Sequence, residues 1–245
     1  MKIGIIYCGY NQLDNIKNTL TFWNNLKIDN VNFIVSVISV PFLEYKDIDV
    51  TLDNSEQFIN NLEKNNIKTI LLEPKFVKER VARTNCMESL INENLDFLWQ
   101  VDSDEYYTKE NVENILNHLK VTNDFEYSVN FKNYIFDGNH YLDDFCVPKI
   151  NRVSGHKILS FADDNQVVYR DFGMIRSIPI PKDIALVKHL TWLHKNGKQK
   201  VEYQLKHFGD CSYRWNNITE ELELDLDYYK RHGYRIPNIL KENYE

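Results

Sequence analysis

Residues 97–107 read FLWQVDSDEYY and combine an apolar run with two closely spaced aspartates. Its mostly apolar first half leads into Asp102-Ser103-Asp104, as in a buried strand that ends in an acidic turn. Side chains two positions apart in an extended segment point to the same side, so Asp102 and Asp104 would lie about 6–7 Å apart. Buried carboxylates are costly unless a cation accompanies them. We therefore predict that Asp102 and Asp104 bind Mn2+ or Mg2+, cations that prefer oxygen ligands.

Three other interpretations of this acidic turn compete with a metal site. A calcium loop of the EF-hand type needs glycine at its sixth position, where Tyr107 stands. A phosphatase motif of the form DxDx(T/V) needs Thr or Val where the chain has Tyr106. The third interpretation is a plain solvated turn after a strand. The apolar run before Asp102 favours the metal over these alternatives.

The composition is that of an ordinary globular protein, with 43% hydrophobic and 27% charged residues among 245. A net charge of -7 without any basic block does not predict a broad nucleic-acid-binding face. The four cysteines show no CxxC spacing, so they predict no zinc site. No apolar run predicts a signal peptide or a membrane span. We expect a cytoplasmic protein with reduced thiols.

The first hundred residues alternate between strand and helix patterns. This alternation predicts an α/β fold with a mostly parallel central sheet flanked by helices. Ligands of such sheets bind at the carboxyl ends of the strands. Gly9 and the Asp102–Asp104 motif both lie at such ends. The expected strands are 2–7, 32–40, 68–72 and 96–101, and the expected helices are 13–26, 55–65 and 79–93.

The chain becomes more irregular after Thr108, which we expect to cap a helix. Residues 125–136 alternate as a long strand, and the tail from Ile218 is ambiguous between strand and helix. There is no internal repeat and no linker composition, so we predict a single domain over 1–245. Its halves would be a nucleotide-binding part, 1–107, and an acceptor-side part, 108–245. The remaining expected elements are strands at 148–153, 157–161 and 167–172, a strand or extended segment at 185–193, and a helix at 198–208.

Three early segments together resemble the GT-A glycosyltransferases of the family 2 type. Residues 3–11, IGIIYCGYN, are similar to the family's first strand and its turn ending in Tyr-Asn. Residues 82–85, ARTN, resemble its Ala-Arg-Asn helix with one inserted residue, and Asp102-Ser103-Asp104 matches its DxD motif. Residues 189–194, HLTWLH, resemble its C-terminal His-containing segment. The likeness covers 1–107 well and 146–208 loosely, and it implies a GT-A (Rossmann-like) fold.

The resemblance implies an enzyme that moves a sugar from a nucleotide-diphosphate sugar, with a UDP-sugar as first choice, to an acceptor hydroxyl. The metal would be held by Asp102 and Asp104, with His189, or His194 as the alternative, completing its shell. The acceptor would be a glycan or a small molecule, and a modified DNA base is an alternative. The residues implied to contact the nucleotide are Tyr7, Cys8, Gly9, Tyr10, Asn11, either Arg80 or Arg83, Asn85, Asp102 and Ser103.

An inverting transferase also needs a carboxylate that accepts the proton of the acceptor hydroxyl. Our candidates are Asp163 and Asp164, in the turn after Phe161, with Asp143 or Asp144 as alternatives. Turns rich in Asp are common without any catalytic role. Residues 148–152, PKINR, resemble a segment that lines the acceptor side in the family, with Lys149 and Arg152 as polar contacts.

Two rival functions remain open on sequence grounds. A nucleotidyltransferase would carry a glycine-rich N-terminal loop with Arg and Lys, which the chain lacks. A nucleotide- or carbohydrate-binding protein could keep the fold without turnover. The second expected strand ends at Pro41 without the acid that the family uses to contact the base, so the sequence does not settle which nucleotide binds.

Overall fold

The computed structural model describes residues 1–43, 53–72, 76–135, 139–156, 158–161, 166–170, 173–190, 197–219 and 221–241. They belong to two compact units. The first unit comprises Met1–Asn130 and Cys146–Val187, and the second comprises Phe131–Phe145 and Lys188–Glu245. The single-domain organisation expected from the sequence stays a prediction.

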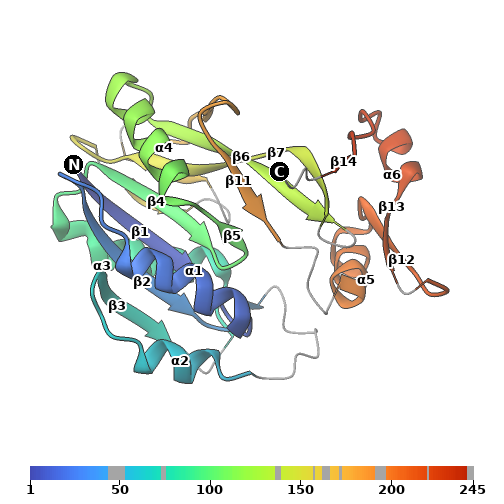
Figure 1. Ribbon diagram of the computed structural model, residues 1–245, viewed down its shortest axis with the longest axis horizontal. Coiled ribbons are helices and arrows are strands. Elements are labelled where there is room, and N and C mark those ends of the chain that lie inside the picture. The colour runs from blue at the N-terminus through green and yellow to red at the C-terminus, as the bar shows by residue number, and fades with distance from the viewer. Residues whose placement is uncertain are drawn as a thin grey trace. The chain divides into compact units, whose positions relative to one another are not determined.

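Four parallel strands form the part of the sheet that positions the site, in the order β3-β2-β1-β4 (Figure 1). Strand β1 (Lys2–Cys8) pairs in parallel with both β2 (Asn32–Ser39) and β4 (Phe97–Asp102). Strand β3 (Ile67–Leu72) pairs in parallel with β2. The parallel arrangement expected for the first hundred residues is therefore confirmed.

Beyond β4 the sheet is no longer purely parallel. Strand β7 (His140–Arg152) runs antiparallel to β4, and the order continues through β6 (Glu126–Ile135) and β11 (Leu186–His189) to β5 (Glu105–Tyr106). The short strand β10 (Ile178–Pro179) pairs with β6. The chain therefore has a mixed α/β fold with a large central sheet.

Helices of the first unit follow the strands as expected, with different ends. They are α1 (Leu13–Asn25), α2 (Ser55–Asn61), α3 (Glu79–Leu90) with a 3-10 turn η2 (Ile91–Glu93), and α4 (Lys109–Val121). Thr108 caps α4 through a capping box with Asn111, as predicted.

Helix α2 ends at Asn61, four residues earlier than the expected end at 65. The reason is a tertiary contact. The side-chain oxygen of Asn24 accepts hydrogen bonds from the backbone N–H groups of Asn65 and Asn66, at 3.0 and 3.1 Å. These bonds hold the backbone in the approach to β3, so it is not available to continue the helix.

The two faces of β4 have different neighbours, because successive side chains of a strand alternate. The Trp99 ring packs edge-on against Trp23 of α1, with ring centroids 5.4 Å apart. Leu98, on the other face, belongs to a buried cluster with Met87 and Leu90 of α3. Asp102 shares the face of Leu98, so its carboxylate emerges on the side of α3.

A small antiparallel sheet completes that cluster. Strands β8 (Ile158–Phe161) and β9 (Val167–Tyr169) pair with each other. Their side chains Ile158, Phe161 and Val167 join the apolar cluster that contains α3. Both strands were predicted, but β9 ends at Tyr169, and the expected continuation through residues 171 and 172 lies outside the described part of the chain.

The second unit has its own small core. Its elements are α5 (Gly197–Phe208), β12 (Tyr213–Asn216), β13 (Glu221–Leu224), α6 (Leu226–Arg231) and β14 (Leu240–Lys241). Val201 of α5 packs in a cluster with Tyr213 and Leu224. The tail, which the sequence leaves ambiguous between strand and helix, contains both. Leu222 and Leu224 alternate in strand β13, and helix α6 follows it directly.

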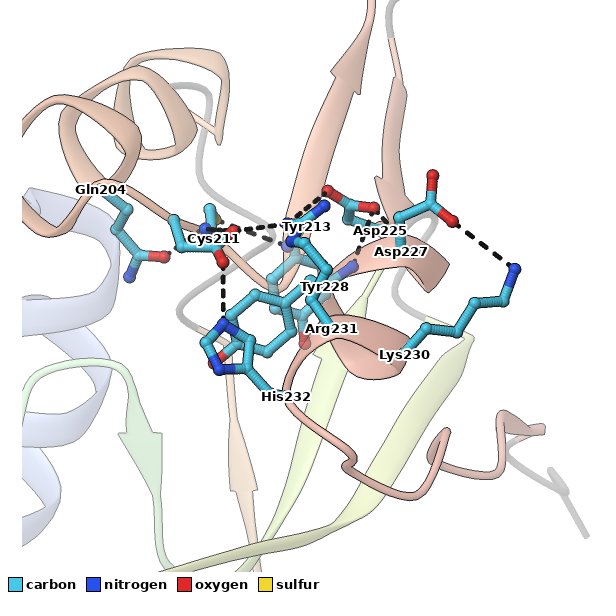
Figure 2. A network of polar contacts seen from close by, with 10 residues as sticks. Gln204, Cys211, Tyr213, Asp225, Asp227, Tyr228, Lys230, Arg231 and His232 are labelled. Carbon is cyan, nitrogen blue, oxygen red and sulfur yellow. Dashed lines mark hydrogen bonds and ion pairs between the residues drawn. The ribbon is translucent and has the colours of Figure 1, made fainter.

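Polar contacts fix α6 within the second unit (Figure 2). Asp225 caps the helix by accepting from the N–H groups of Asp227 and Tyr228. Asp210 accepts from Arg231 Nη2 at 2.8 Å, and its second oxygen lies 2.8 Å from His232 Nε2. The His232 hydrogen bond and the Arg231 charge hold the pKa of Asp210 below its ordinary value. Within the described ranges, no helix combines the length and the apolar character that crossing a membrane requires.

Candidate nucleotide site

The site begins where β1 and β4 end next to each other. Cys8 pairs with Asp102 across the two strands, and the Ser103 N–H donates to the Cys8 carbonyl at 2.7 Å. The Gly9 N–H donates to the carbonyl of Ile38 in β2 at 3.0 Å. The turn after β1 and the DxD turn therefore lie at one edge of the sheet, as the sequence predicts.

Gly9 is required at this edge by close packing. A Cβ atom at position 9 would lie 2.9 Å from Ile16 Cγ1 and 3.0 Å from Ser103 Cβ. Real Cβ atoms rarely approach other atoms so closely, and overpacking of this kind is destabilising. The glycine thus lets helix α1 and the DxD turn come together over the end of β1.

Asp102 is bound by two cations from different elements. Arg83 Nη2 of α3 donates to Asp102 Oδ1 at 2.8 Å, and Lys149 Nζ of β7 donates to Asp102 Oδ2 at 2.8 Å. Burial opposes ionisation of this carboxyl, but the positive charges of Arg83 and Lys149 hold its pKa far below the ordinary value. Asp102 is therefore a carboxylate throughout the physiological range.

Arg83 is almost completely buried, with 2% of its surface exposed. It also donates to Glu79, one turn earlier in α3, through Nε at 3.0 Å and through Nη2. Its Nη1 atom is buried and has no hydrogen-bond partner among the described residues. Leaving a buried charged donor unbonded is costly, so this atom suits an anionic ligand with acceptor oxygens.

The other implied residues of α3 lie elsewhere on the helix. Arg80 and Asn85 are exposed to solvent, whereas Arg83 is directed to the end of β4. The structure thus separates the two arginines that the sequence left as alternatives. Arg83 belongs to the DxD cluster, and Arg80 lies outside the buried ion network.

Glu105 and Lys149 form a buried ion pair that sequence reasoning missed. Lys149 Nζ lies 2.6 Å from Glu105 Oε1, and each side chain is 2% exposed. Burial raises the pKa of Glu105 to about 8 despite the opposing charge of Lys149, and the Asp102 charge adds to the rise. A lysine within the apolar run of β7 was the available signal, because buried lysine needs a carboxylate partner.

Two cations of the predicted acceptor-side segment, Lys149 and Arg152, make contacts within the protein. Lys149 is occupied by Asp102 and Glu105. Arg152 donates to the backbone carbonyls of Asp124 and Thr122, at 3.0 and 2.7 Å, and its guanidinium lies over the Phe97 ring. Both cations therefore have partners within the protein, and their role as acceptor contacts stays a prediction.

The DxD turn is also attached to helix α1. Ser103 Oγ donates to Gln12 Oε1 at 2.8 Å, and Thr19 Oγ1 donates to the Ser103 carbonyl at 3.1 Å. Tyr106 donates through its hydroxyl to Asn15 Oδ1 at 2.9 Å. Asp104, between these anchored residues, is 9% exposed. Residue 104 therefore lies between two residues that are bonded to helix α1 and its N-cap.

The N-terminal turn divides into buried and accessible residues. Tyr7 is fully buried, and its hydroxyl shares a 2.6 Å hydrogen bond with Thr19, while Cys8 is also part of the core. Tyr10 and Asn11 are partly exposed, and Asn11 has a positive φ of 53°. Tyr10 and Asn11 are therefore the side chains of this turn with surface for a ligand.

The remaining implied residues are placed as follows. His189 lies in the second unit, where its Nδ1 is 3.0 Å from Asn133 Oδ1 and its ring stacks on Phe145. Its role as a metal ligand stays a prediction. Asp163 and Asp164 lie outside the described residues, so their role as catalytic base also stays a prediction.

The oxygen donors of the acidic turn match the chemistry of Mn2+ and Mg2+, which prefer carboxylate ligands. Both oxygens of Asp102 already accept from cations, and the described ranges contain no group of three or more His, Cys, Asp or Glu residues arranged for a metal. Mg2+ is commonly held by one or two carboxylates together with substrate phosphates and water. The role of Asp102 and Asp104 as metal ligands stays a prediction.

Comparisons with known proteins add a partial structural likeness. No family model and no curated protein matches the chain. The crystal structure of S. aureus TarS 1–349 in complex with UDP-GlcNAc is 19% identical over 56% of this chain and 36% of that chain, with a TM-score of 0.41. The same fragment in complex with UDP is 19% identical over 56% and 37%, with a TM-score of 0.36. The chain thus spans little more than a third of these structures, and TM-scores below 0.5 carry no conclusion about function.

Proposed function

We propose that the protein is a glycosyltransferase whose first unit binds a nucleoside-diphosphate sugar at the ends of β1 and β4. The observation that carries this proposal is the buried Arg83 guanidinium. It is held by Asp102 and Glu79, and its Nη1 donor has no partner in the described part of the chain. Donors of this kind bind phosphate oxygens well.

In this proposal each residue of the cluster has a separate role. Asp102 orients Arg83, and Arg83 donates to the diphosphate as negative charge develops on it when the glycosidic bond breaks. Asp104 would hold a divalent cation, Mn2+ or Mg2+, which supplies further neutralisation of the leaving diphosphate. Tyr10 and Asn11 would contact the nucleoside, and the carboxylate of Asp163 or Asp164 would accept the acceptor's proton.

The balance of charge in the cluster supports a cationic cofactor. Four carboxylates, on Glu79, Asp102, Asp104 and Glu105, share a small volume with two cations, Arg83 and Lys149. A carboxyl of Glu105 that keeps its proton reduces the excess of negative charge but does not remove it. A divalent cation bound at Asp104 would offset the remainder and favour the approach of a diphosphate.

The experiment is a donor panel read by release of free nucleoside diphosphate. Purified protein is incubated with UDP-, GDP-, CDP- and dTDP-sugars and Mn2+, together with acceptor glycans, small-molecule hydroxyl compounds and DNA that contains hydroxymethylated bases. We expect release from one nucleotide class, with a UDP-sugar tested first, and loss of release in Arg83→Met. A folded protein that neither binds nor hydrolyses any donor would contradict the proposal. Tight binding without transfer to any acceptor would identify a binding protein instead.

A further inference from the structure

One ammonium group joins the two ends of the DxD turn. Lys149 Nζ lies 2.8 Å from Asp102 Oδ2, at the end of β4, and 2.6 Å from Glu105 Oε1, at the start of β5. Ser103 and Asp104 make up the turn between these two carboxylates. We call this arrangement, Asp102–Lys149–Glu105, the turn staple. It links the residues on either side of Ser103 and Asp104 through one side chain.

The staple acts in a buried environment. The side chains of Lys149 and Glu105 are each 2% exposed, and the Tyr107 hydroxyl donates to the second oxygen of Glu105 at 3.4 Å. Hydrogen bonds to a buried ammonium group are shielded from water, so its partners are held close to it. Lys149 itself comes from β7, whose register on β4 is fixed by the pairing of Leu98 with Asn151. The staple is therefore tied to the sheet rather than to a loop.

The opposite side of the turn is tied to helix α1. Ser103 bonds with Gln12 and Thr19, and Tyr106 bonds with Asn15. Staple and helix contacts together leave the backbone of residue 104 little freedom. A carboxylate that shares a cation with a phosphate needs this placement, because metal sites tolerate only small errors in ligand position.

We infer that Lys149 and Glu105 are positioning residues, which place the Asp104 carboxylate for its ligand without touching that ligand. This inference rests on the proposed function and deepens it. It assigns Lys149, a conspicuous cation near the site, to the protein's internal geometry and leaves phosphate contact to Arg83. The staple works through hydrogen bonds to both carboxyl groups, so an uncharged oxygen acceptor at position 105 should preserve it.

The test compares two substitutions of similar size at one position. Glu105→Gln keeps an oxygen that accepts from Lys149, whereas Glu105→Leu removes it. Both variants leave the Lys149–Asp102 pair intact, so folding is expected, and far-UV circular dichroism checks it. Leu116→Ala in α4 serves as a control that weakens the core away from the turn.

The first readout is hydrogen–deuterium exchange of peptides that cover residues 102–107 in ligand-free protein. We expect exchange in this turn to be at least tenfold faster in Glu105→Leu than in Glu105→Gln and to be unchanged in Leu116→Ala. Equal exchange in the two Glu105 variants would overturn the staple. This readout does not depend on what the site binds.

The second readout is the affinity for UDP in the presence of Mn2+, measured by titration calorimetry. We expect Glu105→Leu to bind at least tenfold more weakly than Glu105→Gln, while Leu116→Ala binds as the wild type does. Equal affinities of the two Glu105 variants, next to a loosened turn, would overturn the positioning role. If the wild type binds neither UDP nor another nucleoside diphosphate, the proposed function fails. The positioning role then fails with it, even if hydrogen–deuterium exchange shows that Glu105 holds the turn.

Discussion

Arg83 Nη2 lies 2.8 Å from Asp102 Oδ1, and this contact joins the middle of helix α3 to the carboxyl end of β4. Arg83 holds Asp102 from one side, and Lys149 holds its second oxygen from the other. The first aspartate of the DxD motif is therefore an internal anchor for two buried cations.

Removal of the Arg83 charge should destabilise the protein. Arg83→Met leaves the Asp102 and Glu79 carboxylates without their shared partner. We expect a loss of about 3 kcal/mol in the free energy of unfolding, at the low end for a broken buried pair because the Asp102 side chain keeps 28% of its surface exposed. Urea unfolding followed by circular dichroism measures it.

Arg80→Met provides the matched control, because Arg80 lies on the same helix and is exposed. A surface substitution of this kind changes stability by about 0.5 kcal/mol or less. Equal effects of the two substitutions would show that Arg83 is not held in the buried network.

The sequence predicts that the ends of β1 and β4 meet at one edge, but it does not predict the ion pairs found there. Apolar strands followed by Gly9 and by Asp102-Ser103-Asp104 predict two strand ends at one edge, because parallel strands in an alternating pattern end on the same side. The partners of Asp102 depend on which face of β4 it occupies and on the antiparallel register of β7. Neither follows from local periodicity, so Lys149 was assigned to acceptor binding.

Overpacking at Gly9 should couple it energetically to helix α1. Gly9→Ala places a Cβ 2.9 Å from Ile16 Cγ1, and we expect a loss of about 1–3 kcal/mol in stability. Ile16→Ala removes the obstructing atoms at its own cost of about 2–5 kcal/mol. The double variant should lose less stability than the sum of the two single losses, with a difference of about 0.5 kcal/mol or more. Strict additivity in urea unfolding would argue against the close contact.

Glu105 should make the stability of the metal-free protein fall as pH rises. Its pKa is raised in the folded protein to about 8, above the ordinary value of 4.5, so the folded state binds the extra proton between these values. The stability from this proton is complete below about pH 4.5 and is lost as pH rises through about 8. The slope is at most about 1.4 kcal/mol per pH unit from this one group.

The measurement is the urea midpoint at pH 5, 6, 7 and 8 in a buffer with EDTA. Glu105→Gln cannot ionise, so its stability should decline less steeply over this range than that of the wild type. Asp102 does not confound the comparison, because its lowered pKa makes stability fall only in acid, in both proteins. Parallel curves for the two proteins would show that Glu105 is ionised throughout.

Other parts of the site escaped prediction for physical reasons. The motif resemblance implied Tyr7 as a ligand contact, but strand alternation turns this residue toward α1, where it bonds with Thr19. The sequence leaves Arg80 and Arg83 as alternatives, and the packing of α3 on the sheet buries Arg83 while Arg80 stays exposed. Tertiary contacts also decide two other elements. The bonds of Asn24 to the backbone end helix α2 early, and the core of the second unit determines the structure of the tail.

The central claim is that the ends of β1 and β4 bind a nucleoside diphosphate together with a divalent cation held by Asp104. The most direct measurement is calorimetric titration of UDP, with GDP, CDP and dTDP in parallel, into wild type and Asp104→Asn, each with Mn2+ and with EDTA. We predict that Mn2+ tightens binding of one nucleotide at least tenfold in the wild type and has no effect in Asp104→Asn. A folded wild type that binds none of them, or an equal Mn2+ effect in both proteins, would contradict the account.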